Sequence, residues 1–243
     1  MLLVMSAPSL LLHLHIDGDP NIWTRRLGGA LGAAADGFQP NGRVYLLCGG
    51  PWTETPLSSA SVSTLSLIFD CVPPTAPLLD LVPLLPTAGW DAAAVGAIED
   101  VLAVLVPADV SGEETETLAQ VASARLASGL GELEHTPAAP LGPPVATVER
   151  DDAGNSPGEL LHPCVAVGGT FDRMHAGHRL LLAVSALVCS KTAFVGITGD
   201  LLLASKHNAH LIWPFERREA TAANYMRAVR PSLEVRAGAL GEN

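Results

Sequence analysis

The chain has 243 residues, of which 48% are hydrophobic and 16% charged. This composition excludes a chain that is disordered throughout, because it supplies enough apolar side chains for one large core or two small ones. Four cysteines lie far apart with no Cys-x-x-Cys pair. They predict buried, reduced thiols in a cytoplasmic protein and argue against a zinc site or a disulfide framework.

Charge is divided unevenly along the chain. Residues 1–160 hold five arginines, no lysine and nineteen acidic residues, a net charge of −14, whereas residues 161–243 hold nine basic and six acidic residues, a net charge of +3. The acidic part argues against nucleic acid as a partner, and the basic part suits a small polyanion such as a nucleotide. An ordinary solvated surface is the alternative explanation of the charge pattern.

The first region, residues 1–134, reads as a smaller α/β unit. Its opening apolar stretch lacks a basic segment, is interrupted by Pro8 and predicts a buried strand in place of a targeting segment. No apolar run approaches the ~20 residues of a membrane span, so none is expected. The pattern predicts strands at Leu10–Ile16, Arg43–Cys48 and Leu65–Val72, and helices at Ile22–Ala35, Trp90–Val106 and Glu114–Leu130.

Two features of this region bear on chemistry or on element boundaries. Asp91 is placed to cap the helix predicted at Trp90–Val106, because its carboxylate can accept hydrogen bonds from the first unpaired amides of that helix. His13 and His15 would share one face of a strand, as two metal ligands do, but without a third ligand we interpret them as packing or surface residues. No motif here predicts an activity.

Residues 135–160 are rich in proline, glycine and small polar residues and predict an exposed linker. Residues 161–243 then alternate strands and helices, which predicts half of a Rossmann-like, doubly wound parallel sheet. The expected strands are Cys164–Gly169, Thr192–Thr198 and Leu233–Ala237, and the expected helices are His178–Lys191 and Phe215–Val229.

The segment between the first of these strands and its helix carries the predicted chemistry. Ligands bind there in open α/β sheets, because strand ends and helix amino termini converge at that edge. Gly168 and Gly169 let the backbone approach a phosphate closely, and the exposed amides of the helix start stabilise negative charge.

His175 and His178 are three residues apart and face the same side of the first helical turn. As hydrogen-bond donors they can stabilise the charge of a polyphosphate during displacement. Zinc is the rival ligand, but zinc-binding helices of metalloproteases space their histidines by four with a glutamate between them. Phosphate binding is therefore favoured over a metal site.

Gly169-Thr170-Phe171-Asp172 followed by His175-Ala176-Gly177-His178 resembles the first signature of the nucleotidyltransferase superfamily. Together with Arg173 it is most similar to the phosphopantetheine adenylyltransferase domain of eukaryotic coenzyme A synthase. Similarity extends over most of residues 164–240, through Asp200–Lys206, Trp213–Arg218 and Arg230–Leu233.

The resemblance implies transfer of AMP from ATP, with Mg²⁺, to 4′-phosphopantetheine in coenzyme A biosynthesis. It implies that His178, assisted by His175 and Lys206, binds the phosphates and that Thr170 contacts a transferring phosphate. Phe171 and Gly177 complete the nucleotide-binding loop. Asp172 either shapes the loop or touches Mg²⁺.

The sequence departs from the family because the serine-rich second signature and the later strands do not follow Leu233–Ala237. This predicts a truncated nucleotidyltransferase domain whose uncovered sheet edge favours association into a homo-oligomer. Two alternatives stay open. One is another nucleotidyltransferase, acting on a phospho-alcohol with CTP or on nicotinamide mononucleotide, and the other is a non-catalytic nucleotide-binding remnant.

Overall fold

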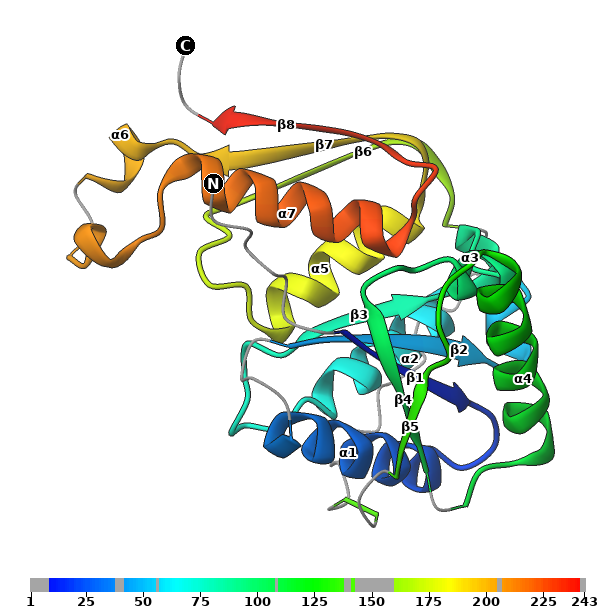
Figure 1. Cartoon of the computed structure of the whole chain (residues 1–243). Coiled ribbons are helices and arrows are strands. Elements are labelled where there is room, and N and C mark those ends of the chain that lie inside the picture. Colours follow the sequence, from blue (N-terminus) through cyan, green and yellow to red (C-terminus); the bar gives the residue numbers. More distant parts are fainter. Residues whose placement is uncertain are drawn as a thin grey trace.

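The computed structural model describes residues 9–37, 42–55, 57–107, 109–137, 141–142, 160–204 and 207–240. Two parallel sheets and their crossover helices make the fold α/β and Rossmann-like (Figure 1). The strands of the first sheet are β1 (Ser9–His15), β2 (Arg43–Gly49), β3 (Asp80–Leu84), β4 (Val101–Val106) and β5 (Glu134–Pro137). The strands of the second sheet are β6 (His162–Gly169), β7 (Cys189–Thr198) and β8 (Glu234–Leu240).

The helices connect consecutive strands. They are α1 (Pro20–Gly37), α2 (Ser59–Asp70), α3 (Ala92–Gly96), α4 (Gly112–Ala127), α5 (Ala176–Leu187), α6 (Asp200–Leu203) and α7 (Phe215–Val229). Single turns of 3₁₀ helix occur at Pro51–Thr53, Pro86–Ala88 and Ala209–Leu211. In the described residues, no helix combines the length and the apolar character that a membrane crossing needs.

The first sheet has the strand order β3-β2-β1-β4-β5. Leu10, Leu11, Leu12 and Leu14 of β1 are all buried, as expected for a central strand covered on both faces. Because the order reverses beside β1, right-handed crossovers place α1 and α2 on one face and α3 and α4 on the other. The first region, expected to be the smaller unit, therefore carries the larger sheet.

The strand predicted at Leu65–Val72 is wrong, because residues 65–70 of this apolar run form the end of α2 and Cys71 is its C-cap. Short apolar runs do not distinguish strand from helix by periodicity. The deciding signal precedes the run: Ser58 and Ser61 form a reciprocal capping box that satisfies amides at the start of α2.

The helix predicted at Trp90–Val106 is right only at its start. Asp91 does cap a helix, since its side chain accepts the Ala94 amide at 2.8 Å, but α3 ends at Gly96. The remainder forms β4, whose Val-Leu-Ala-Val-Leu-Val run suits a strand beside β1. The sequence pattern also missed β3 and β5, and β5 extends into the segment expected to be a linker.

The helices and strands of the second sheet agree more closely with those predicted from the sequence. Helix α7 has the predicted bounds, whereas α5 ends four residues before the expected Lys191 and β7 begins earlier, at Cys189. Sheet order β6-β7-β8 places the first strand at an edge. Of the four unpaired cysteines, three are buried as predicted, and Cys164 on β6 is exposed.

Helices α5 and α7 lie between the second sheet and the β3 edge of the first (Figure 1). Buried side chains from both sheets form one continuous hydrophobic cluster. The Tyr225 hydroxyl on α7 donates to the carbonyl of Leu81 at 2.8 Å, and the Trp90 indole donates to the carbonyl of Val229 at 3.0 Å. The two regions thus share a core and buried polar contacts.

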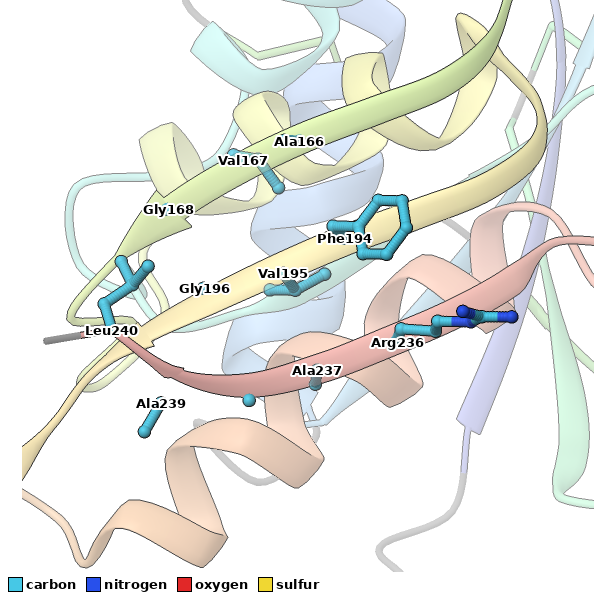
Figure 2. A pocket seen from close by; sticks show the side chains of 11 residues that line it. Ala166, Val167, Gly168, Phe194, Val195, Gly196, Arg236, Ala237, Ala239 and Leu240 are labelled. Carbon is cyan, nitrogen blue, oxygen red and sulfur yellow. The ribbon is translucent and has the colours of Figure 1, made fainter. Parts of the chain in front are cut away.

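The opposite face of the second sheet is open (Figure 2). It forms a shallow hollow of ≈ 440 Å³ in which Phe194 is 43% exposed. Leu240 lies over the strand where Gly196 has no side chain; a Cβ there would come 2.5 Å from the leucine. The two histidines of the motif are not among the residues that line this hollow.

Candidate functional site

The loop from β6 to α5 is held in a strained conformation. Phe171 and Arg173 have positive φ angles of 49° and 42°, a region that non-glycine residues rarely adopt. Phe171 is fully buried, with its ring beneath Gly169, where a Cβ would come 3.1 Å from the ring. Gly169 is therefore required by close packing within the loop, and strain of this kind is typical of functional sites.

Arg218 of α7 anchors the strand ends behind the loop. It is fully buried and donates to the carbonyls of Thr170 at 3.1 Å and Thr198 at 2.9 Å, which follow β6 and end β7. It also donates to the Trp213 carbonyl and to the carboxylate of Asp200. One guanidinium thus fixes the spacing of the two strand ends that border the candidate site.

Asp172 ties the loop to the segment before α7. Its carboxylate accepts the Trp213 amide at 2.9 Å and the Arg173 guanidinium at 3.0 Å. Arg173 also donates to the carbonyl of Leu211, and its guanidinium lies 5.7 Å from the centre of the Trp213 ring. Arg217 lies 3.6 Å from the same ring. Two exposed arginines therefore flank the loop.

His175 and His178 are brought together at the start of α5. Their ring centres are 4.0 Å apart, with an angle of 31° between the planes. His175 is the N-cap, and its Nδ1 accepts the amide of Gly177 at 3.2 Å. Because Nδ1 accepts, the proton of the neutral ring is on Nε2, which is available as a donor to an anion.

His178 is half-buried beside an apolar ring. Its ring centre lies 5.6 Å from that of Phe171 in an edge contact. Burial lowers the pKa of His178, and the neighbouring His175 and Arg179 lower it further, while Asp172 opposes them. The ring is therefore neutral at pH 7, and an arriving polyanion would favour its protonation.

Most of the predicted site residues lie on this one loop. Gly169, Thr170, Phe171, Asp172, His175, Gly177 and His178 are all between the end of β6 and the first turn of α5. Thr170 lies beside Thr198, with 3.5 Å between the hydroxyl oxygens. Gly168 belongs to β6 and faces the open side of the sheet (Figure 2). Lys206 lies outside the described residues.

The roles of two arginines at the site were not predicted individually. Arg217 and Arg218 belong to the Trp213–Arg218 run that supported the resemblance, but only the structure separates the ring contact from the buried anchor. A sequence signal exists for Arg218, since it shares a helical face with Ala222, Tyr225 and Val229, all buried. An arginine on the apolar face of a helix indicates a buried anchor.

The described residues do not form a site for a protein-held metal ion. No group of three or more histidine, cysteine, aspartate or glutamate side chains converges among them. Asp172, the carboxylate proposed to touch Mg²⁺, uses its oxygens to bind Trp213 and Arg173. The geometry favours the loop-shaping role that the sequence left open for this residue.

The corresponding edge of the first sheet is closed by an ion pair. Arg26 of α1 donates to the fully buried carboxylate of Glu114 at 2.8 Å, and that carboxylate also accepts the amide of His15. His13 is buried and donates from Nδ1 to the carbonyl of Leu47 at 2.8 Å. His15 lies 3.2 Å from Glu113. These contacts agree with packing roles for both histidines.

Comparison with known proteins gives partial matches. The chain is 40% identical over 70 residues to the phosphopantetheine adenylyltransferase of Saccharomyces cerevisiae, covering 29% of this chain and 23% of that protein. It is 46% identical over 54 residues to the phosphopantetheine adenylyltransferase of Pyrococcus abyssi, covering 22% of this chain and 34% of that one. An uncharacterized Schizosaccharomyces pombe protein is 31% identical over 88 residues, covering 36% of this chain and 28% of that protein.

No family model matches the chain. The chain spans less than half the length of these curated relatives. The similarities nevertheless support a relationship to nucleotidyltransferases, since two of the three proteins carry an adenylyltransferase name.

Proposed function

We propose that this chain carries the phosphate-binding part of a pantetheine-phosphate adenylyltransferase, which transfers AMP from ATP to 4′-phosphopantetheine. The observation that carries the proposal is the adjacent pair of rings of His175 and His178 at the amino terminus of α5. Two imidazoles and the helix amides converge where a parallel sheet ends, an arrangement suited to a polyphosphate. The identity of the acceptor substrate is inferred from the names of two of the relatives, which are phosphopantetheine adenylyltransferases.

In the proposed reaction, a phosphate oxygen of 4′-phosphopantetheine attacks the α-phosphorus of ATP. A new P–O bond forms to the acceptor, the bond from the α-phosphorus to the bridging oxygen breaks, and pyrophosphate leaves. The products are dephospho-coenzyme A and pyrophosphate, and no side chain becomes covalently modified. The acceptor phosphate is already nucleophilic, so the protein mainly orients the reactants and offsets charge.

The side chains around the motif have distinct proposed roles in this step. Nε2–H of His175 donates to a phosphate oxygen, and His178 adds a second donor 4.0 Å away, ring centre to ring centre. Arg173 and Arg217 supply exposed positive charge around Trp213. Arg218 holds the strand ends in place from behind. Mg²⁺ is proposed to arrive with ATP, as part of the substrate MgATP.

The test is pyrophosphate release by the purified chain with MgATP, with and without 4′-phosphopantetheine. We expect release that depends on the acceptor. The His178→Ala variant should release pyrophosphate about a hundredfold more slowly, because loss of one well-placed donor raises the barrier by ~3 kcal/mol. His162→Ala is the matched control: this exposed histidine lies at the start of β6, where its amide donates to the carbonyl of Val188 at the carboxyl end of α5, the end opposite to the motif. Its removal should leave the rate unchanged.

Parallel reactions separate the alternatives. CTP with a phospho-alcohol, or ATP with nicotinamide mononucleotide, would release pyrophosphate if the chain served another nucleotidyltransferase reaction. Binding of ATP that His178→Ala weakens, without turnover with any acceptor, would identify a nucleotide-binding module. Equal rates for His178→Ala and His162→Ala would contradict the proposed role of the motif.

A further inference from the structure

A partly buried ion network joins the first sheet to the helix that carries the motif. Arg179 follows His178 directly and is 6% exposed. Its guanidinium forms an ion pair with the carboxylate of Asp80, the first residue of β3, and donates to the carbonyl of Leu78. The second oxygen of Asp80 accepts from Arg43 of β2 at 2.9 Å. One carboxylate thus serves two arginines, one from each region of the chain.

Arg179 also belongs to the turn that presents the two histidines. Its amide donates to the carbonyl of His175 at 3.1 Å, which closes the first turn of α5. On its other side the guanidinium lies 5.4 Å from the centre of the Tyr225 ring, and the hydroxyl of Tyr225 is bonded to Leu81 of β3. The side chain is therefore held between β3 and α7 while its backbone holds the turn of the motif.

We infer that Asp80, on the first sheet, is a positioning residue for the nucleotide site: through Arg179 it fixes the first turn of α5 and offsets the positive charge beside His178. The inference rests on the proposed function for its consequence in catalysis, but the contact exists in the protein without nucleotide. It also gives residues 1–134 a role, which no motif in that region supplied.

The physical basis is electrostatic: the positive charge of Arg179 acts on the ring of His178, and the carboxylate of Asp80 is paired with that same arginine. His178 is faced by His175, Arg179 and Asp172, and positive charge on Arg179 disfavours a second positive charge on the imidazole. Asp80 reduces the field of Arg179 at His178 for as long as the ion pair holds. Loss of Asp80 and loss of Arg179 should therefore shift the His178 pKa in opposite directions, although both break the same contact.

The decisive experiment is an NMR titration of the His178 ring in the full chain without nucleotide, with the resonance assigned by its loss in His178→Asn. We expect Asp80→Asn to lower the pKa of His178, because Arg179 is left uncompensated. Arg179→Met should raise it, because the neighbouring cation is removed. A role in stability alone would move both variants in the same direction.

Arg43→Met is the matched control, since it removes the other arginine of the network and leaves Asp80 paired with Arg179. It should leave the His178 titration unchanged while lowering the free energy of unfolding. If Asp80→Asn does not fold, Arg179→Lys replaces it: with charge retained, its titration should match the wild type while that of Arg179→Met rises.

Shifts of the same sign in Asp80→Asn and Arg179→Met, or no shift in either, would overturn the inference. The consequence for catalysis is measured separately. If the wild type releases pyrophosphate, Asp80→Asn should lower kcat about tenfold through misplacement of the turn, with a smaller change in KM for ATP. An inactive wild type would refute the proposed function, and the titration would still decide the inference.

Discussion

The two parallel sheets begin with the same succession of strand, helix, strand, helix and strand, but different side chains lie at their carboxyl edges. After β1, the edge is closed by Arg26 and the buried carboxylate of Glu114. After β6, the loop is anchored from behind by Arg218, and the imidazoles of His175 and His178 are left at the front. Topology supplies the location of a site, whereas the loop and its anchors decide whether a ligand can use it.

The sheets also differ in how they are covered. The first has helices on both faces, and its central strand β1 is buried from Ser9 to Leu14, whereas the central strand β7 of the second sheet has Phe194 exposed toward the hollow (Figure 2). Truncation of a large apolar side chain in the central strand should therefore lower the free energy of unfolding more in the first sheet than in the second. Three sets of substitutions test these differences, from the largest expected effect to the smallest.

The two arginines that lie at the carboxyl edges of the sheets, Arg26 and Arg218, should differ most. Arg26→Met leaves the carboxylate of Glu114 buried and unpaired, which should cost about 3–5 kcal/mol of unfolding free energy. Arg218→Met leaves backbone carbonyls without a donor and should cost about 1–3 kcal/mol, together with loss of nucleotide binding. Urea unfolding at pH 7, monitored by tryptophan fluorescence, measures the loss of unfolding free energy in both variants.

Unfolding at low pH provides the control for Arg26→Met. Although burial alone would raise the pKa of Glu114, hydrogen bonds from Arg26, His15 and Ser111 hold it below its usual value. This contribution to stability is present above the unfolded pKa of the carboxyl and is lost as pH falls through the lower folded pKa. The variant and the wild type should therefore converge in acid, and a constant difference would show that the charge pair is not the cause.

Central strands provide the second comparison. Leu12→Ala in β1 should cost about 2–5 kcal/mol, because a fully buried side chain leaves a cavity. Phe194→Ala in β7 should cost less than about 0.5 kcal/mol, as expected for an exposed position. Similar losses in the two variants would show that the open face is covered in solution.

The smallest effect concerns two histidines, one at each sheet. Burial lowers the pKa of both His13 and His178. Because the unfolded chain then binds protons more readily, stability is fully present above the unfolded pKa of about 6.5 and decreases as pH falls below it. This part of the pH dependence should be lost in His13→Gln and in His178→Asn, as measured by urea unfolding of each variant and of the wild type between pH 5 and 8.

Addition of MgATP should distinguish His178 from His13. MgATP should raise the pKa of His178, because an anion favours the protonated ring, and should leave His13 unchanged behind the Arg26–Glu114 pair. NMR titration of the two rings in the presence of MgATP measures the difference. Equal responses would contradict the assignment of the site to the second sheet.

The sequence alone determined the features that depend on neighbouring residues. The motif loop, the bounds of α7 and the Asp91 cap follow from local rules, since a helix start needs a nearby acceptor and a glycine is needed where a ring packs on the backbone. These rules act over a few residues, so one sequence suffices to recognise them.

Only the tertiary structure decided the features that join distant residues. The run at 101–106 became a strand because it pairs with β1, a partner that periodicity does not show. Arg26 meets Glu114, and Arg179 meets Asp80, across 88 and 99 positions of sequence. Burial of a charge requires its partner but does not say where in the chain that partner lies. Folding of the first sheet brings Arg26 of α1 to Glu114 of α4, and packing of the two sheets brings Arg179 of α5 to Asp80 of β3.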